Sequence, residues 1–547
     1  MKKTDLLAST LAAILFFICN ACDSDEKNNG NPFPDIPESY VLSPETVSAK
    51  SLVGNGTPDS PFLIRNAMDF KYFIESVNSG TLRPIYEDEQ YSGRMIVSLM
   101  HDIEISDDYN WIPICFPDDS PGMDFNGGSH TISGSMRMRK ELYLDMYLSV
   151  AGLFGNAEYL YINNLNVSAN LIPSALSGTP RNFLAGIIIA DAKSCQLDNV
   201  TVSGKLTIMY HTGNTSGLGG FCGRSMESSY SNCKMEGKFE FVPYPGKDKI
   251  KLGEYLYLGG ITGLSQSVAT ESYRSCYNYS DISVKNVSLS ELSVGGIIGC
   301  RQTSTGSTAI PDLLIVENLG DITISNVSWI KHNESSPRAI YVGGLYGRGG
   351  QGEECGKIIN NADISVSKVA MPAYVGGIAG WCDFGAYIGE ATNAGNITNN
   401  GDSGYTGGCY GCLYADAKHL FNLGNVSSTI EIKGNLDNWD DFIGSTGGIV
   451  GYLPAHTIKE SSNSGNITTP SPFIHMDSEV SYGGGIIGRG SERTKIVDCT
   501  NYGSINNSID NYGTENGFTW LALKKIAAGK WDKESAGYKW WYWYIFG

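Results

Sequence analysis

The sequence predicts an all-β fold: a right-handed parallel β-helix with a small α/β cap at its N-terminus and an aromatic cap at its C-terminus. Three observations predict it. A degenerate motif recurs about ten times, a short alternating strand follows the motif, and the 66 glycines lack the three-residue period of collagen. Each unit of such a repeat can bury its apolar face only by stacking on a neighbour, so the repeat fixes the architecture.

The first element is a targeting segment. A basic start precedes an apolar run from Leu6 to Ile18, which is too short to span a bilayer comfortably. Ala21 then stands directly before Cys22, and a small residue before a cysteine at this point resembles a bacterial lipobox. The resemblance implies that residues 1–21 are a lipoprotein signal peptide and that Cys22 carries the lipid. An ordinary signal-peptidase site is the alternative.

A tether is expected at residues 22–50, which are polar and have little apolar content. It opens with the acidic run Asp23 to Glu26, which resembles the signal that sends lipoproteins of Bacteroides-type bacteria to the outer face of the outer membrane. The resemblance implies a surface-exposed protein held to outer-membrane lipid through Cys22.

An N-terminal α/β cap and the first coils are expected at residues 51–150. Apolar residues recur at helical spacing between Asn66 and Val77, and Arg94 to Ile105 has the pattern of strands. This unit continues through Trp111–Ile114 to Phe125–Ile132.

The repeat itself runs Gly-Gly-apolar-any-Gly, then a variable stretch, then Asn-any-Gly-any-Ile. The complete copies are Gly295–Gly299 with Asn318–Ile322, Gly376–Gly380 with Asn393–Ile397, Gly447–Gly451 with Asn463–Ile467, and Gly484–Gly488 with Asn501–Ile505. After the asparagine step, Ile322 and Ile324 point to one side and Thr323 to the other, as in a strand. The glycine of that step can take φ > 0, which predicts a corner. A β-sandwich, the competing fold, should not regenerate one motif ten times.

A family resemblance follows from these residues. The order of Gly56-Thr57-Pro58, the helix, Trp111–Ile114, Phe125–Ile132 and Gly152–Gly155 resembles the bacterial surface proteins that carry GLUG motifs. The resemblance covers roughly residues 52–510. It implies a GLUG-type β-helix at residues 151–510 and an adhesin-like surface lipoprotein.

The cysteines read as core residues. Cys276 and Cys499 occupy the slot filled elsewhere by Val316, Ile358, Ala391 and Leu420, Cys233 matches Cys276, and Cys409 fills the slot of Ile297, Ile378 and Ile449. A buried free cysteine behaves as a small hydrophobe. Cys409 and Cys412 have redox or zinc spacing but no second pair.

Catalytic and cofactor sites are not expected. The seven histidines form no His-Glu-any-any-His motif, and there is no Gly-any-Ser-any-Gly elbow, phosphate loop or calcium nonapeptide. We therefore assign no catalytic residue, metal or cofactor. The net charge of −18 disfavours nucleic acid as a partner.

Two binding surfaces are proposed instead. If coils stack in register, the residues after the Gly-Gly motif form one lateral row rich in guanidinium and aromatic groups, suited to sugars or acidic polymers: Arg224, Leu264, Arg348, Trp381, Tyr452 and Arg489. The alternative is that these residues are ordinary surface variation. The second is the tail at residues 511–547, where Trp540, Trp541 and Trp543 could stack on sugar rings. The alternative is that the tail caps the open end of the β-helix.

The expected function is therefore non-catalytic: adhesion, or binding of glycans or of host or bacterial surface proteins. Two alternatives stay open. The β-helix could be the scaffold of a polysaccharide lyase or glycoside hydrolase, or the protein could be a structural subunit of a surface assembly.

Overall fold

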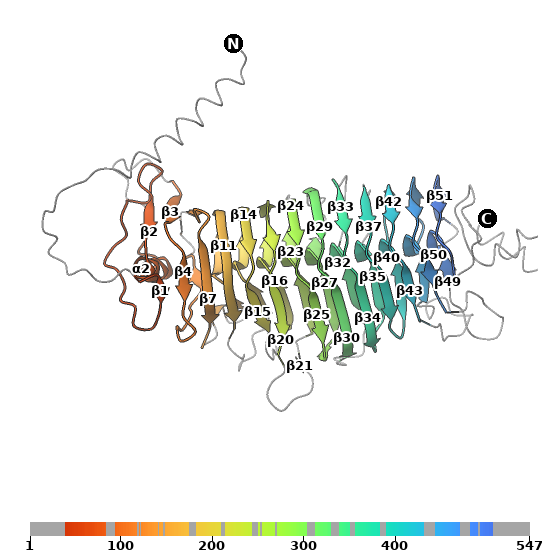
Figure 1. Ribbon diagram of the computed structural model, residues 1–547, viewed down its shortest axis with the longest axis horizontal. Coiled ribbons are helices and arrows are strands. Elements are labelled where there is room, and N and C mark those ends of the chain that lie inside the picture. The colour runs from red at the N-terminus through yellow and green to blue at the C-terminus, as the bar shows by residue number, and fades with distance from the viewer. Residues whose placement is uncertain are drawn as a thin grey trace, which may run out of the picture. The chain divides into compact units, whose positions relative to one another are not determined.

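A computed structural model describes the protein at residues 39–83, 93–117, 120, 122–139, 142–145, 148–173, 182–208, 214–242, 250–251, 254–267, 271–303, 312–329, 339–349, 356–382, 390–430, 444–470, 482–490 and 493–506. Cys22, Trp540, Trp541 and Trp543 lie outside these residues. The described residues, all from Ser39 onward, belong to one compact unit. In this unit parallel strands stack coil upon coil, which confirms the predicted parallel β-helix (Figure 1).

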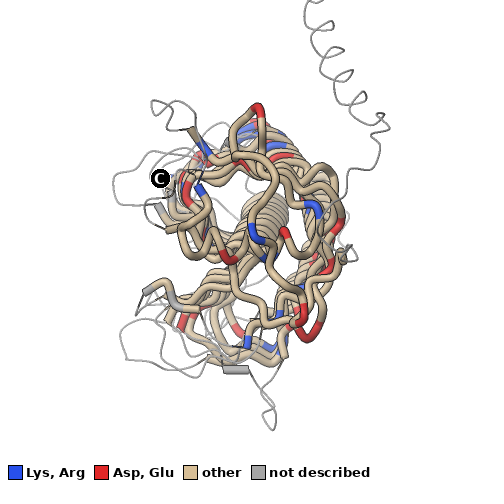
Figure 2. Tube along the Cα trace, turned by 90° about the vertical axis from the view of Figure 1, so that its left-hand side faces the viewer, with Lys and Arg blue, Asp and Glu red and all other residues tan. Residues whose placement is uncertain are grey.

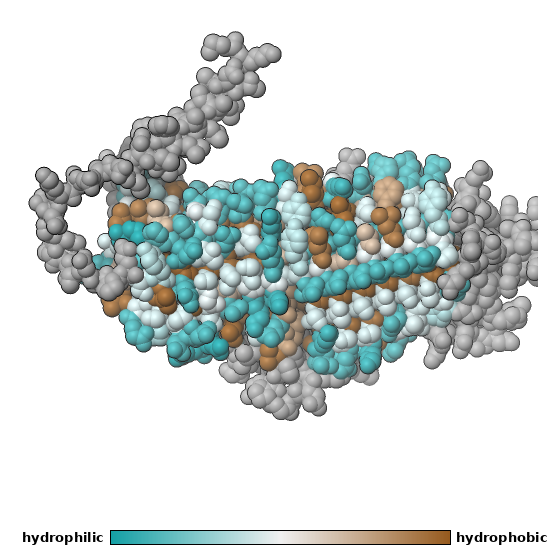
Figure 3. All heavy atoms as spheres, in the orientation of Figure 1, coloured by the Kyte–Doolittle hydropathy of each residue, from teal (hydrophilic) through white to brown (hydrophobic). Residues whose placement is uncertain are grey.

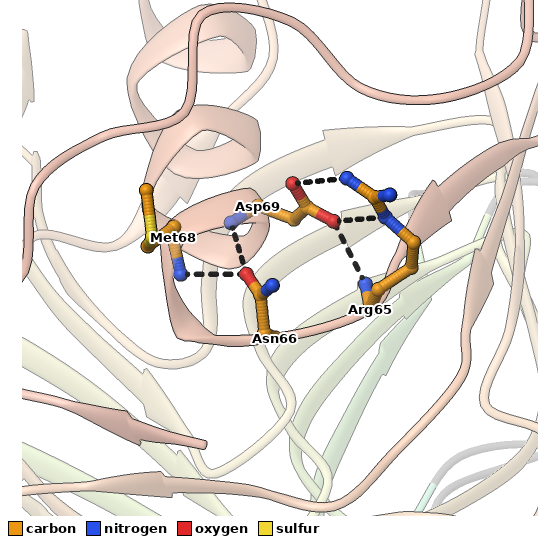
Figure 4. Close-up of polar contacts among 4 residues, drawn as sticks. All are labelled: Arg65, Asn66, Met68 and Asp69. Carbon is orange, nitrogen blue, oxygen red and sulfur yellow. Dashed lines mark hydrogen bonds and ion pairs between the residues drawn. The ribbon is translucent and has the colours of Figure 1, made fainter. Parts of the chain in front are cut away.

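The N-terminal end carries the predicted helix, α2 (Ala67–Asn78), the one helix among the described residues. It begins where the sequence predicts because Asn66 caps it: the Asn66 Oδ1 accepts hydrogen bonds from the backbone N–H groups of Met68 and Asp69, both at 3.1 Å (Figure 4). Arg65 pairs with Asp69 at 2.8 Å on the same turn. The strands around this helix are β1 (Val41–Leu42), β2 (Phe62–Ile64), β3 (Met95–Leu99) and β4 (Ile103–Ile105).

Strand β1 lies within the range expected to be a tether. It pairs in parallel with β4, and Leu42 is buried. The same 19-stranded sheet then runs on through the repeats, so the coils begin in this N-terminal region.

Each coil approaches its Gly-Gly turn along an 11-stranded sheet, which we call the entry sheet. Its strands are β8 (Leu142–Asp145), β9 (Leu148–Ala151), β12 (Asn182–Gly186), β16 (Thr215–Gly219), β22 (Tyr255–Gly259), β27 (Glu291–Gly295), β31 (Ile340–Gly343), β35 (Ala373–Gly376), β39 (Gly404–Gly407), β44 (Gly444–Gly447) and β49 (Tyr482–Gly484). All pairings in it are parallel except that of β8 with β9.

After the turn the chain runs along a second 11-stranded sheet, the exit sheet. Its strands are β5 (Ile114–Cys115), β10 (Phe154–Glu158), β13 (Ile189–Lys193), β17 (Cys222–Met226), β23 (Thr262–Ser267), β28 (Ile298–Thr303), β32 (Tyr346–Gly349), β36 (Ala379–Cys382), β40 (Tyr410–Leu413), β45 (Val450–Leu453) and β50 (Ile487–Gly490). Eleven strands make ten steps of about 4.8 Å, or about 48 Å of rod.

The 19-stranded sheet leads to the asparagine corner. After β1–β4 its strands are β6 (Met123–Asn126), β7 (Thr131–Arg137), β11 (Leu160–Ile172), β14 (Gln196–Val202), β15 (Lys205–Ile208), β18 (Ser229–Ser231), β19 (Lys234–Met235), β20 (Lys238–Phe241), β24 (Ser272–Asn278), β29 (Asp312–Asn318), β33 (Ile358–Asn360), β37 (Ala391–Asn393), β42 (Leu420–Asn422), β47 (Ser462–Asn463) and β52 (Thr500–Asn501).

The coils are completed by two smaller sheets. One contains β21 (Ile250–Lys251), β25 (Ile282–Lys285), β26 (Val287–Leu289), β30 (Ile322–Trp329), β34 (Ile364–Val369), β38 (Ile397–Asn400), β43 (Val426–Ser428) and β48 (Ile467–Thr468), and the other β41 (Ala417–Lys418), β46 (Thr457–Lys459) and β51 (Lys495–Val497). A view along the rod shows positive and negative residues interspersed around the coils (Figure 2).

The corner asparagines are buried and joined to one another, which we call the asparagine ladder. Each side-chain amide except that of Asn501, the last, donates one hydrogen bond to the asparagine of the next coil and one to the carbonyl two residues on, as Asn360 does to Asn393 (2.7 Å) and to Ala362 (2.8 Å). The ladder comprises Asn278, Asn318, Asn360, Asn393, Asn422, Asn463 and Asn501. A row of buried amides that satisfy one another is the structural reason for the repeated asparagine.

The expected role of the corner glycine is wrong. Five of the seven ladder asparagines are followed two residues later by a glycine, such as Gly320, and none of these glycines has φ > 0; Ser280 and Ala362 take the position in the other two coils. A Cβ at Gly320 would overlap the backbone of Ser280 in the preceding coil, and one at Gly424 would overlap that of Gly395. At these positions glycine allows neighbouring coils to approach closely, and the local dihedral angle is not the reason for it.

The core fills the inside of the coils, and the cysteines predicted to lie there, Cys233, Cys276, Cys409 and Cys499, belong to it. The register pairs Cys276 with Val316, and Ile378 and Ile449 bond the backbone of Cys409 from either side. Cys233, Cys276 and Cys409 are fully buried free thiols, and burial raises the pKa of Cys409 well above its usual range.

In the described part of the chain no helix has the length and apolar character needed to cross a bilayer.

Candidate functional site

The structure places the six predicted exit residues in one row. The register of the exit sheet pairs Arg224 with Leu264, Arg348 with Trp381, and Tyr452 with Arg489. Cys300 and Cys412 fill the two intervening coils. The row therefore runs straight along the rod, one residue per coil.

The members of this row differ in what they can offer a ligand. Arg224 is held by Asp191 of the preceding coil in a bidentate pair, at 2.8 and 2.6 Å. Leu264 is buried, as are Cys300 and Cys412. The N-terminal part of the row is thus occupied by an ion pair and apolar side chains, which leaves the part from Arg348 onward as the candidate site.

A second row, which the sequence reasoning missed, faces this part from the entry sheet. The register aligns Tyr257, Ser293, Tyr341, Tyr374, Tyr405 and Ser445. A signal for it was present: the same pattern, Tyr-any-Gly-Gly, stands at Tyr257, Tyr341, Tyr374 and Tyr405. Since the residue after each tyrosine points into the core, strand alternation puts the tyrosine outside.

The outward faces of the two sheets meet at the Gly-Gly turn. A Cβ on Gly380 of β36 would lie 2.5 Å from the Tyr374 carbonyl oxygen of β35 and from the Val342 nitrogen. Beyond this close approach the side chains of the two rows touch: the Tyr374 and Trp381 ring centroids are 5.1 Å apart, at 85°. The result is a continuous aromatic surface along the rod.

We call this surface the aromatic row; it comprises Tyr341, Tyr374, Trp381, Tyr405, Tyr414 and Tyr452. Tyr341 and Tyr374 stack on adjacent coils at 5.4 Å and 13°, whereas Trp381 packs edge-on to both. Tyr414 lies 5.1 Å from Trp381, and Tyr405 lies 4.8 Å from Tyr452. Tyr405 is buried and the other five are half-buried; burial raises the pKa of Tyr374 and Tyr405, so their hydroxyls stay neutral.

An arginine stands at each end of the aromatic row. The Arg348 guanidinium lies over the Tyr341 ring at 5.5 Å and 3.8 Å from the Glu291 carboxylate. The Arg489 guanidinium lies over the Tyr452 ring at 5.2 Å and donates to the Tyr405 hydroxyl at 3.3 Å. Both arginines pack on aromatic faces, as cation–π pairs do.

Polar groups continue the surface beyond Arg348, in what we call the polar patch: Tyr257, Gln266, Glu291 and Gln302. Gln266 donates to Gln302 at 2.9 Å, and Gln302 donates to the Tyr257 hydroxyl at 3.3 Å. That hydroxyl lies 3.5 Å from the Glu291 carboxylate. The amide of Gln302 is exposed, so this end of the surface can exchange hydrogen bonds with a ligand.

Another polar cluster is buried inside the coils. The Glu271 carboxylate accepts hydrogen bonds from the hydroxyls of Ser225 and Ser265. Arg301, which is buried, follows Ser265 in register. Burial raises the pKa of Glu271 to about 7, although both serines and Arg301 act to lower it. No sequence signal marked these residues, because they interrupt the apolar pattern rather than repeat it.

An exposed row of acids and amides crosses the corner turns of the C-terminal half, and Figure 3 shows a continuous hydrophilic row along these coils. Each side-chain oxygen accepts the backbone N–H of the next coil, as from Asp321 to Asp281 and from Asp363 to Asp321, both at 2.9 Å. These oxygens therefore bond one coil to the next.

Within the described residues, no group of three or more His, Cys, Asp or Glu could hold a metal ion.

Comparisons with known proteins add a single structural likeness. No protein-family model and no curated protein matches the chain. Among solved structures, the chain is similar to one from Bacteroides ovatus named "putative immunoglobulin A1 protease", at 13% identity and a TM-score of 0.26, covering 80% of this chain and 86% of that one. A likeness at that score carries no argument about what this chain does.

Proposed function

We propose that this protein is a non-catalytic, surface-anchored binding protein that holds glycans on its aromatic row. The observation that carries the proposal is the continuous aromatic surface of six side chains contributed by consecutive coils. Aromatic rings in this setting bury a large area while their hydroxyl or indole N–H groups keep a polar handle, a combination suited to sugar rings.

The same surface gives no support to a catalytic role. A glycosidase needs two carboxyl groups flanking the bond that is cleaved. In the described part of the chain the carboxylate beside the aromatic row is Glu291, which is 6% exposed and lies near Arg348 and Tyr257. The adhesin reading therefore remains our proposal, with the lipid anchor at Cys22 placing the rod at the outer face of the outer membrane.

A glycan array probed with the full chain tests the function. We expect binding to glycans without release of shorter products, and loss of binding in Trp381→Ala, since a central tryptophan commonly dominates a binding surface. Tyr279→Ala is the matched control, because Tyr279 is an exposed aromatic residue at the asparagine corner, outside the row. Product release from any glycan would establish the enzyme alternative, and binding that survives Trp381→Ala would move the site elsewhere.

A further inference from the structure

The aromatic row has a direction, which constrains the shape of its ligand. Tyr341 and Tyr374 are partners in the parallel register and stack nearly flat on each other, so their ring normals follow the rod axis. Trp381 stands at 77° and 85° to these two rings. Its face therefore runs along the rod, and the Tyr414 ring of the next coil packs against Trp381 with a tilt of 36° and a centroid distance of 5.1 Å.

A ligand that stacks on Trp381 and Tyr414 thus lies lengthwise. From Arg348 to Arg489 the surface spans four coil steps of about 4.8 Å, or about 19 Å. Over this distance the side chains change coil by coil, but the backbone that presents them repeats in register. A linear polymer can use every coil of such a surface, whereas a compact ligand could contact two or three.

The charges along the row point to an uncharged ligand. Arg348 has Glu291 at 3.8 Å, and Arg489, 8% exposed, is engaged with Tyr405 and Tyr452. Both guanidinium groups are thus used by the protein. The chain carries a net charge of −18, which repels polyanions over the Debye length of about 8 Å at physiological salt.

At the end formed by the polar patch, the surface can recognise hydrogen-bonding groups of a ligand rather than its charge. The polar patch offers the exposed amide of Gln302, itself oriented by Gln266 and by the Tyr257 hydroxyl. Hydroxyl and amide substituents are the partners that such an amide can both donate to and accept from.

We infer that the ligand is an unbranched, uncharged glycan, which lies along the rod with its rings on Trp381 and Tyr414 and one end at the polar patch. This rests on the proposed function, because it names the class of glycan that the same surface takes. The inference excludes acidic polymers as ligands, although the predicted row with its arginines was compatible with them.

Calorimetric titration of the full chain can test this, with linear glucan and mannan oligosaccharides in a length series and with the same chains oxidised to uronic acids at C6. We expect affinity to rise with length until the chain covers about 24 Å, the five coil steps from Gln302 to Arg489, and then to level off. The oxidised chains should bind about tenfold more weakly or worse. Trp381→Ala should weaken binding about thirtyfold, as at a central hot spot, and Tyr279→Ala should leave it unchanged.

The variant Gln302→Ala distinguishes the contribution of the polar patch to binding from that of the aromatic row. It should weaken binding of long oligosaccharides, which reach the polar patch, more than binding of short ones; an equal effect at all lengths would overturn the orientation. Oxidised chains that bind as well as neutral ones would overturn the ligand class but leave glycan binding standing. If neither neutral nor oxidised chains bind, the proposed function itself fails. Folding of each variant is checked by its circular dichroism spectrum and melting temperature.

Discussion

At the scale of single residues, Glu271 shows how an interrupted pattern creates a titratable core. Cys195 and Ser228 occupy the equivalent buried position in the two preceding coils. Glu271 therefore places a carboxyl group where those coils have a small side chain. The groups that face it are Arg301, Tyr230, Tyr273 and Cys222. Arg301 stays charged, while burial raises the pKa of both tyrosines and of Cys222 further above neutrality. Glu271 is therefore the member of this cluster that titrates near neutral pH.

The sign of its pH dependence follows from its pKa. The folded pKa of about 7 exceeds the ordinary value of 4.5, so the folded state holds the proton more tightly than the unfolded chain. The stabilisation is fully present below about pH 4.5 and is lost as the pH rises to about 7, by up to about 3 kcal/mol. We expect Glu271→Gln to flatten the unfolding free energy over this window in denaturant titrations. The control Glu390→Gln, at an exposed site, should keep the wild-type slope.

Ile315 shows strain at one residue. It has φ +58° and is 49% exposed, whereas the equivalent left-handed positions of earlier coils hold Asn164, Asn199, Asn232 and Ser275. A β-branched residue is a true outlier in this conformation. Ile315→Asn should raise the free energy of unfolding by about 1 kcal/mol, seen as a higher urea midpoint with an unchanged slope. Leu314→Asn, at the exposed neighbouring residue, should give no such gain; an equal gain would show that lost surface hydrophobicity is the cause.

At the scale of elements, the asparagine ladder joins the coils. Asn360 donates to Asn393 and Ala362 and accepts from Asn318. Asn360→Ala would leave buried partners unsatisfied, so we expect a loss of about 2–4 kcal/mol in the free energy of unfolding, measured by chemical denaturation. The adjacent Asn361 is exposed, and Asn361→Ala should change stability by less than about 0.5 kcal/mol. Similar losses for both variants would mean that the ladder adds nothing.

Elements also show how far the sequence could predict the molecule. The repeat predicted stacking, so the slot of Cys276 and the alignment of Arg348 with Trp381 followed from register. It did not predict why the Gly-Gly motif and the asparagine motif occur in the same coil. The reason is steric, because a Cβ on Gly377 would overlap the Asn393 amide of that coil. Contacts between residues distant in sequence leave no mark in composition. The tyrosine row was not predicted, because its residues precede the Gly-Gly step whereas the predicted row consists of residues that follow the motif.

At the scale of the whole molecule, the proposed function requires that the rod be held at the cell surface. Each coil pairs its strands with those of the coils directly before and after it, so stability is built locally along the rod and does not require the membrane. Anchoring and folding should therefore be separable. The lipobox-like sequence before Cys22 predicts that the tether, not the rod, attaches the protein.

Cys22→Ala tests this separation. If Cys22 carries the lipid as predicted, the variant should leave the membrane fraction for the soluble fraction, while the melting temperature of the released chain matches that of the detergent-extracted protein. Cys499→Ala is the matched control: its thiol is buried in the last described coils, so it should keep the protein on the membrane and lower its stability by about 1 kcal/mol. A Cys22→Ala protein that stays with the membrane would show that the rod itself, or another segment, makes the attachment.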